Sequence, residues 1–226
     1  MSSLKHNTQS VLELIADTAK PGERTLIAIA GPPGSGKSTL AEAVVDRVNQ
    51  SADPSWSAEL LPMDGYHLDT EVLEPMGLLP RRGAPETFDA QGFLDLLKKV
   101  RSSGDDIRFP VFDRAQDHSV PDAGLLRAET EVVVVEGNYL LLDQPIWREL
   151  HELFDASVFL QNTLETLKQR LMNRWLGLGF SNAHAERKVF DNDLKNAQLV
   201  LGHSVGADLI LHEPLPKPND HSLSSR

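Results

Sequence analysis

The chain contains no cysteine. This absence excludes a disulfide framework, a thiolate nucleophile and a cysteine-based zinc site. No apolar run approaches the roughly 20 residues that are needed to span a bilayer. Residues 1–10 are polar and lack the apolar core of a signal peptide. We therefore expect a cytoplasmic protein that does not associate with membranes.

Basic residues are scarce relative to acidic ones. Lys and Arg number 22 and Asp and Glu number 33, which gives a net charge of −11. This balance argues against broad nucleic-acid binding, because such binding needs a basic surface. A site for a polyanionic ligand would have to be built locally, from a few basic side chains and backbone amides.

Short apolar runs alternate with amphipathic segments along the 226 residues, a length that suits one sizeable domain. The pattern predicts strands at 25–30, 59–63, 132–135, 156–160 and 207–211. It predicts helices at 8–19, 38–49, 89–100, 145–153, 163–176 and 181–200. This alternation is typical of an α/β fold with a doubly wound parallel sheet flanked by helices.

The predicted organisation has three parts. Residues 1–24 form an N-terminal helix that packs on the domain, residues 25–212 form the domain, and residues 213–226 form a disordered tail. Within the domain, residues 65–130 are a long insert rich in Pro, Gly, Arg and Asp. Loop regions of that length in compact domains are usually functional, so we expect the insert to bind substrate.

The run from Gly31 to Ser38 matches the pattern G-x-x-x-x-G-K-[ST] between a predicted strand and a predicted helix. Its glycines let the backbone curl so that N–H groups point at phosphate oxygens, and the helix adds its positive dipole end. The motif predicts a P-loop NTPase fold that binds ATP and Mg²⁺, with Lys37 on the β- and γ-phosphates and Ser38 on the metal. The predicted nucleotide-binding residues are Gly31, Gly34, Ser35, Gly36, Lys37, Ser38 and Thr39.

A P-loop alone does not fix the reaction, because GTPases, ATP-driven motors and metallochaperones share it. The chain has no Asn-Lys-x-Asp run for reading guanine, no Asp-Glu pair at the end of its valine strand and no metal-binding tract. These features favour a small-molecule kinase. A nucleotide-driven switch or metallochaperone, and a regulator that binds ATP without chemistry, are the alternatives.

Two carboxylates follow predicted strands: Asp64 after the second strand and Glu136 at the end of the valine strand. Ligands of doubly wound sheets sit beyond the carboxyl ends of the strands, so both should face the P-loop. Asp64 is the candidate general base for a substrate hydroxyl. Glu136 is the candidate Mg²⁺ ligand beside Ser38, directly or through water. The two roles could also be exchanged, which makes Asp64 a candidate metal ligand as well.

Together with the P-loop, the runs Met63-Asp64-Gly65-Tyr66-His67, Phe109-Pro110-Val111-Phe112-Asp113 and Val135-Glu136-Gly137 resemble the phosphoribulokinase / uridine kinase / type I pantothenate kinase superfamily. The resemblance covers about residues 25–211, and residues 79–89 are similar to a stretch of pantothenate kinases. The whole pattern is most similar to bacterial proteins labelled fructose transport system kinases. The resemblance implies that Asp64 is the base, that Ser38 and Glu136 serve the metal, and that Asp113 hydrogen-bonds substrate hydroxyls.

The acceptor of the phosphate is less well specified. The chain has Phe112 where uridine kinases have a tyrosine, His118 lies one residue later than their histidine, and the Tyr-Ser-His run of pantothenate kinases is missing. A pocket of Asp, His and Arg suits a polyhydroxyl substrate. We therefore expect a small hydroxyl substrate, first a sugar such as fructose, then pantothenate or a related acid, then a nucleoside. The predicted substrate-binding residues are Tyr66, His67, Arg82, Asp113 and His118.

A lid is expected over residues 170–185. Arg170 and Arg174 stand four residues apart on one face of a predicted helix, which leads into the glycine-bearing segment 176–180. A lid of this kind excludes water and neutralises charge on the transferring phosphoryl group. These two arginines join Lys37 and Asp64 as the predicted catalytic residues. The oligomeric state stays open, with a homodimer as one alternative.

Overall fold

The computed structural model describes residues 3–20, 22–51 and 56–212. The predicted disordered tail at 213–226 lies outside these described residues. Among them, no helix combines the length and the apolar character that crossing a membrane requires.

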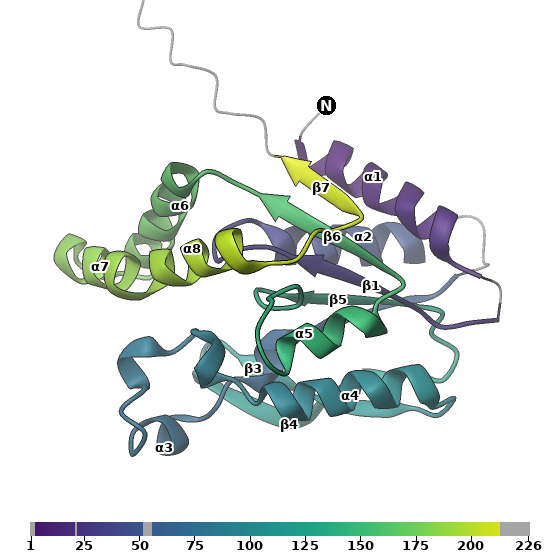
Figure 1. The fold of residues 1–226 in the computed structure, drawn as a ribbon, viewed down its shortest axis with the longest axis horizontal. Helices are drawn as coiled ribbons and strands as arrows, with labels where there is room; N and C mark the ends of the chain where they lie inside the picture. Colours follow the sequence, from purple (N-terminus) through teal and green to yellow (C-terminus); the bar gives the residue numbers. More distant parts are fainter. Residues whose placement is uncertain (1–2, 21, 52–55, 213–226) are drawn as a thin grey trace, which may run out of the picture.

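A parallel sheet of five strands in the order β2-β5-β1-β6-β7 forms the centre of the protein (Figure 1). The strands are β1 (Thr25–Ala30), β2 (Ala58–Pro62), β5 (Val132–Gly137), β6 (Ala156–Gln161) and β7 (Leu209–His212). Every residue of β1 and β5 is buried, as expected for strands covered on both faces. The predicted doubly wound α/β fold is confirmed.

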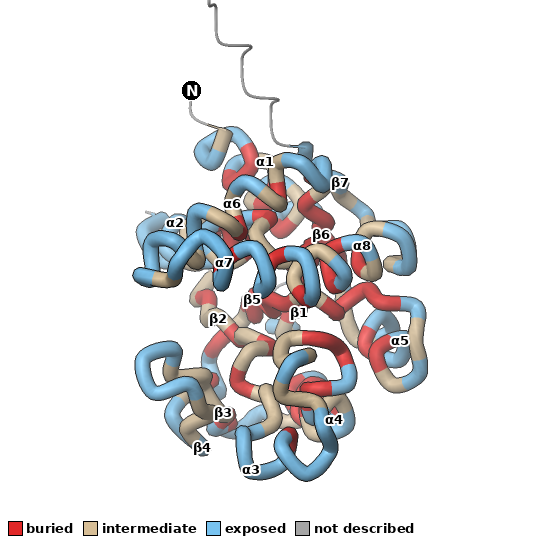
Figure 2. The backbone as a smooth tube through the Cα atoms, turned by 90° about the vertical axis from the view of Figure 1, so that its left-hand side faces the viewer, coloured by how far each residue is buried: buried red, intermediate tan, exposed pale blue. Residues whose placement is uncertain are grey.

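Helices cover both faces of this sheet. The helices of the chain are α1 (Ser3–Thr18), α2 (Lys37–Asn49), α3 (Thr70–Leu73), α4 (Ala90–Ser102), α5 (Trp147–Leu150), α6 (Leu164–Gly177), α7 (Asn182–Lys188) and α8 (Leu194–His203), of which α3 and α7 lie away from the sheet (Figure 1). Ile27 and Ile29 of β1 pack with α1 and α2, whereas Leu26 and Ala28 pack with α4, α5 and α8. The alternation of side chains along the strand thus divides the core into two layers. Figure 2 shows the buried residues concentrated in the sheet and the exposed outer surface of α7.

The insert at 65–130 is more regular than the sequence analysis expected. Besides α4 it contains an antiparallel hairpin of β3 (Ile107–Asp113) and β4 (His118–Leu126). The register shifts between Phe109 and Val111, at Pro110. Proline cannot donate to a strand ladder and is therefore confined to edges and bulges. The proline and the polar residues of this segment obscured the alternating pattern of the strand.

The hairpin packs closely on the turn that carries Asp64. This turn is a short 3-10 helix, Met63–Tyr66, directly after β2. A Cβ atom at Gly65 would overlap the backbone carbonyl of Pro110 in β3. Only glycine therefore allows this approach of the two backbones, which sets the position of Asp64 relative to the hairpin.

The second predicted helix of the lid region, 181–200, is interrupted. Between α7 and α8 the chain forms a π-helical turn, Val189–Asp193, an irregularity that is frequent at functional sites. The indole N–H of Trp175 in α6 donates to Asp193 Oδ2 at 2.7 Å. Burial raises the pKa of the Asp193 carboxyl, and this donor opposes the rise only in part. This half-buried carboxylate therefore ties α6 to the turn.

We expect Gly65→Ala to lower the free energy of unfolding by about 1–3 kcal/mol, because the added methyl group forces two backbones apart. Gly104→Ala is the matched control, since a Cβ atom at Gly104 would meet nothing within 4 Å. Thermal unfolding of both variants measures the effect. Equal melting temperatures for the two variants would contradict the close approach.

We expect Asp193→Asn to stabilise the protein at pH 7, since the amide oxygen still accepts from Trp175 and the buried charge is gone. Because burial raises the carboxyl pKa, the folded wild-type protein holds this proton more tightly than the unfolded chain does. The contribution of Asp193 to stability therefore falls as the pH rises above 3.8, its ordinary pKa. The gap in melting temperature, about 2–4 °C per kcal/mol for a chain of this size, should close near pH 4.

Differential scanning fluorimetry between pH 4 and 8 measures this gap. Asp191→Asn serves as the control, because Asp191 is an exposed acid in the same turn. A gap that does not change with pH would show that the burial of charge at Asp193 is not its cause.

Candidate functional site

The P-loop joins β1 to α2 through backbone that glycine favours. Gly34 and Gly36 adopt left-handed φ angles of +79° and +92°. Helix α2 begins at Lys37, with Gly36 as its N-cap residue. The first N–H groups of a helix have no partner inside it, so this end of α2 presents donors and a positive dipole to an anion.

A buried ion pair lies at the base of the P-loop. Lys37 Nζ is 3.6 Å from Glu136 Oε1, and the two side chains are only 11% and 5% exposed. Burial raises the pKa of the Glu136 carboxyl, Lys37 opposes this rise, and the negative charge of Asp64 adds to it. The Ser38 hydroxyl lies close enough to lower the pKa of the Glu136 carboxyl. The ends of β1, β2 and β5 thus bring together Lys37, Ser38, Glu136 and Asp64.

Arg114, at the turn of the hairpin, is the partner of Asp64. Its Nη2 atom donates to Asp64 Oδ2 at 2.8 Å. The sequence analysis did not select Arg114 as a site residue. Its position in the sequence did not indicate a contact with Asp64, because this contact depends on how the hairpin packs on residues 63–66.

His67 lies beside Asp64 and packs against two aromatic rings. Its Nδ1 atom lies 2.8 Å from the backbone carbonyl of Asp64, and its ring packs against Phe88 and Phe112. Burial lowers the pKa of His67, which favours the neutral imidazole. Tyr66 points elsewhere: its ring packs on Phe93 of α4, and burial raises its pKa to about 12.

The remaining predicted substrate residues gather at the hairpin turn. The Asp113 carboxylate accepts hydrogen bonds from the backbone N–H groups of residues 115 and 116, so it closes this turn. His118 stands opposite Asp113 in the strand register. Arg82 binds Asp117 through a side-chain ion pair of 3.0 Å and donates to the Thr70 hydroxyl. In the structure, Asp113 and Arg82 are therefore engaged in contacts with other parts of the chain.

The two predicted lid arginines take different positions. Arg170 Nη1 donates to the backbone carbonyls of Gly34 and Ser35 at 3.2 and 3.1 Å. Arg174 instead lies over the ring of Trp175, 5.8 Å from its centroid. Although both residues stand on α6, only Arg170 contacts the P-loop among the interactions seen in the described part of the chain.

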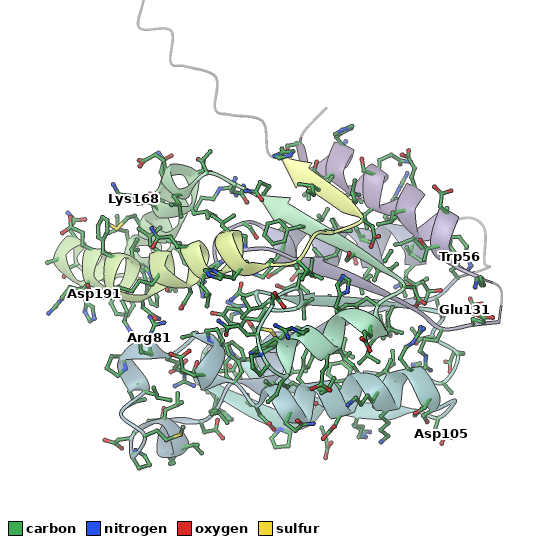
Figure 3. All side chains as sticks on the ribbon, viewed as in Figure 1. Trp56, Arg81, Asp105, Glu131, Lys168 and Asp191 are labelled. Atoms are coloured by element: carbon green, nitrogen blue, oxygen red, sulfur yellow. The ribbon has the colours of Figure 1, made fainter. Side chains whose placement is uncertain are left out.

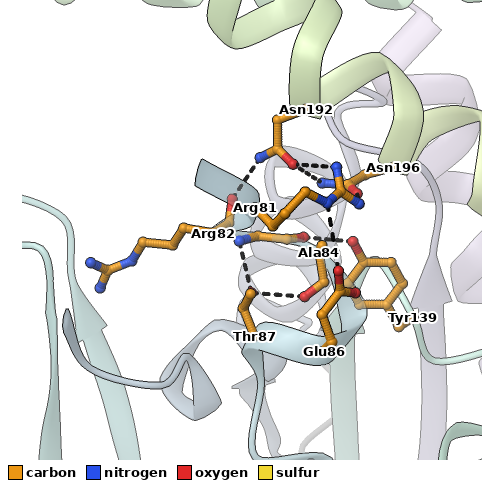
Figure 4. A network of polar contacts seen from close by, with 9 residues as sticks. Arg81, Arg82, Ala84, Glu86, Thr87, Tyr139, Asn192 and Asn196 are labelled. Carbon is orange, nitrogen blue, oxygen red and sulfur yellow. Dashed lines mark hydrogen bonds and ion pairs between the residues drawn. The ribbon is translucent and has the colours of Figure 1, made fainter. Parts of the chain in front are cut away.

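A polar network ties the insert to the π-turn and α8 (Figure 4). Arg81, labelled in Figure 3, donates from Nη1 to Asn192 Oδ1 at 2.8 Å and from Nη2 to Asn196 Oδ1 at 3.2 Å. In return, Asn192 Nδ2 donates to the backbone carbonyl of Arg82 at 2.7 Å. The Tyr139 hydroxyl donates to the next carbonyl, that of Gly83. Segment 79–89 is therefore fixed to the π-turn on one side and to the segment after β5 on the other.

A cavity of about 280 Å³ adjoins the P-loop on its other side. Gly36 and Thr39 line it together with Leu160 of β6 and Arg170 of α6. The first turns of α1 form the remaining wall. The loop thus has the carboxylates on one flank and a cavity on the other.

Comparison with known proteins places these features in a family. The model of the "Phosphoribulokinase / Uridine kinase family" matches residues 26–174. The uncharacterized protein YggC of Escherichia coli strain K12 is 37% identical over 195 residues, which cover 86% of this chain and 80% of that protein. A Schizosaccharomyces pombe protein named as a candidate uridine kinase, C227.14, is 32% identical over 201 residues, covering 86% of this chain and 85% of its own.

A solved structure agrees with this assignment. The crystal structure of a candidate fructose transport system kinase from Silicibacter sp. TM1040 superposes with a TM-score of 0.83 and 40% identity. The match covers 93% of this chain and 98% of that chain. With its P-loop, its parallel sheet and these matches, the chain belongs to the phosphoribulokinase / uridine kinase family of P-loop kinases.

Proposed function

We propose that the protein is an ATP-dependent kinase that transfers the γ-phosphate to a hydroxyl group of a small metabolite. The observation that carries this proposal is the cluster of Lys37, Glu136 and Asp64, drawn from the ends of three neighbouring strands. The ammonium group of Lys37, for the phosphates, and the carboxylate of Asp64, for the acceptor, then lie at the same end of the sheet. Phosphoryl transfer needs little more than this positioning and charge stabilisation.

On the nucleotide side, residues 31–39 hold the triphosphate through backbone N–H groups, and Lys37 reaches the β- and γ-phosphates. Ser38, Glu136 and Asp64 offer the oxygen ligands that Mg²⁺ prefers, and an ion shared with the phosphates suits this donor set. When bound, the ion supplies charge neutralisation on the phosphate oxygens. A cation there also offsets the unfavourable burial of the Glu136 carboxylate.

On the acceptor side, Asp64 accepts the proton of the substrate hydroxyl. The hydroxyl oxygen forms a bond to the γ-phosphorus, the bond from that phosphorus to the β–γ bridging oxygen breaks, and ADP leaves. Arg114 forms an ion pair with the Asp64 carboxylate in this structure. When the acceptor binds, the Arg114 side chain must move away or bind this carboxylate together with the acceptor hydroxyl. Arg170 already lies at the P-loop, and closure of the lid would bring Arg174 toward the transferring group and exclude water.

We infer that the acceptor is a sugar of the fructose type. The 40% identity to a candidate fructose transport system kinase over nearly the whole chain supports this choice. Tyr66, His67, Arg82, Asp113 and His118 are the proposed substrate residues. The hydroxyl groups of a sugar could replace the contacts that Arg82 makes with Asp117 and Thr70 and that Asp113 makes with the hairpin turn. A nucleoside is the second candidate, because the relative named as a candidate uridine kinase shares 32% identity.

We expect purified protein with Mg²⁺ and ATP to release ADP slowly alone and faster with the correct acceptor. A coupled ADP-release assay over fructose and other sugars, pantothenate and nucleosides measures this. Asp64→Asn should reduce the acceptor-dependent rate by about 10²–10⁴-fold, the usual contribution of a general base, while nucleotide affinity is kept. Asp95→Asn is the control, since Asp95 lies on the exposed surface of α4.

Full acceptor-dependent activity in Asp64→Asn would overturn the assignment of the base. A wild-type rate that no acceptor of these three classes changes would count against the kinase function itself.

A further inference from the structure

Helix α1 forms one wall of the cavity beside the P-loop. Ser3, Leu4 and Asn7 of α1 line the cavity opposite Gly36 and Thr39. The cavity is therefore continuous with the phosphate-binding backbone on one side. On the other side it is closed by a helix that precedes the family's matched region, residues 26–174.

Asn7 breaks the apolar pattern of this helix. Asn7, Val11 and Ile15 stand four residues apart on one buried stripe of α1, and Val11 and Ile15 fill the core over β1. Asn7 is only 7% exposed, yet its side-chain amide forms no hydrogen bond with any residue that the structure describes. Asn7 lines the cavity, so its amide is available there for a hydrogen bond to a ligand.

The order of the strands indicates which part of a nucleotide would reach the cavity. Asp64 follows β2 and Glu136 ends β5, so the acceptor side lies on one flank of the P-loop. The γ-phosphate must face that flank for transfer. The nucleoside therefore leaves the loop on the opposite flank, toward Thr39 and Leu160, where the cavity lies.

We propose that α1 forms the outer wall of a purine-binding subsite and that the Asn7 amide hydrogen-bonds to the edge of the base. The proposal rests on the proposed nucleotide-dependent function. A carboxamide offers a donor and an acceptor side by side, which matches the amino group and ring nitrogen of adenine. Leu4 and Leu160 supply apolar surface for the faces of the base, as cofactor sites usually do. Asn7 is thus a specificity residue contributed by the N-terminal helix.

Isothermal titration calorimetry with two probes separates a base contact from a phosphate contact. The probes are the non-hydrolysable analogue AMP-PNP and inorganic tripolyphosphate, both with Mg²⁺. In Asn7→Leu we expect the affinity for AMP-PNP to fall about tenfold, the usual effect of losing such hydrogen bonds, and the affinity for tripolyphosphate to stay unchanged. Gln9→Leu is the matched control, because Gln9 is exposed on the same helix and bonds only to Glu13 among the contacts seen in the described residues.

Asn7→Asp provides a second variant of nearly the same volume, which loses the amide donor and should also weaken AMP-PNP alone. It decides the matter if Asn7→Leu fails to fold, as judged by circular dichroism. Unchanged AMP-PNP affinity in a folded Asn7 variant, or an equal loss for both probes, would overturn the proposal. Failure of the wild-type protein to bind AMP-PNP at all would instead overturn the proposed function, so the two failures are distinguishable.

Discussion

The buried contact between Lys37 and Glu136 is the interaction on which the site depends. Strands β1 and β5 pair in parallel with Ala30 opposite Gly137, so the P-loop and Glu136 leave the sheet at the same level. Removing two charges from water costs several kcal/mol, and a buried pair repays this only with good geometry and further hydrogen bonds. The Lys37 Nζ to Glu136 Oε1 distance of 3.6 Å is long for such a pair, and among the hydrogen bonds seen in the described residues none joins Lys37 to Glu136. The arrangement is better explained by the binding of phosphates and a cation than by stability.

The same reasoning extends to Asp64, which reaches this pair from a different direction. It stands on a 3-10 turn whose glycine lets the hairpin approach, and the hairpin in turn supplies Arg114. Two elements far apart in sequence therefore position one carboxylate. Segment 79–89 of the same insert is joined through Arg81 to Asn192 of the π-turn. The segment from Asn182 to His203 is therefore tied to the insert by side-chain hydrogen bonds.

The sequence predicts the central sheet and the P-loop well, and the reason is local. A P-loop is continuous in sequence, and the strands beside it are short apolar runs, so Lys37 and the fold could be recognised from neighbouring residues alone. The hairpin was missed because Pro110 and many polar residues mask its period of two. The Arg81–Asn192 contact joins residues 111 positions apart, so no local sequence pattern could predict it. Asn7 lies before the helix predicted at 8–19, and no pattern in the sequence indicated that its side chain is buried.

This division of predictable and unpredictable features has a functional meaning. Groups that bind phosphate stand at the ends of the central strands, which every member of such a fold must build in the same way. The residues proposed to bind the acceptor lie on the insert, where Asp113, Arg82 and His118 stand at or beside a hairpin turn. Family membership therefore supports the inference of the phosphoryl donor more strongly than the inference of the acceptor. The identity of the acceptor has to be inferred from the contacts of the insert, because the same sheet occurs in kinases with different acceptors.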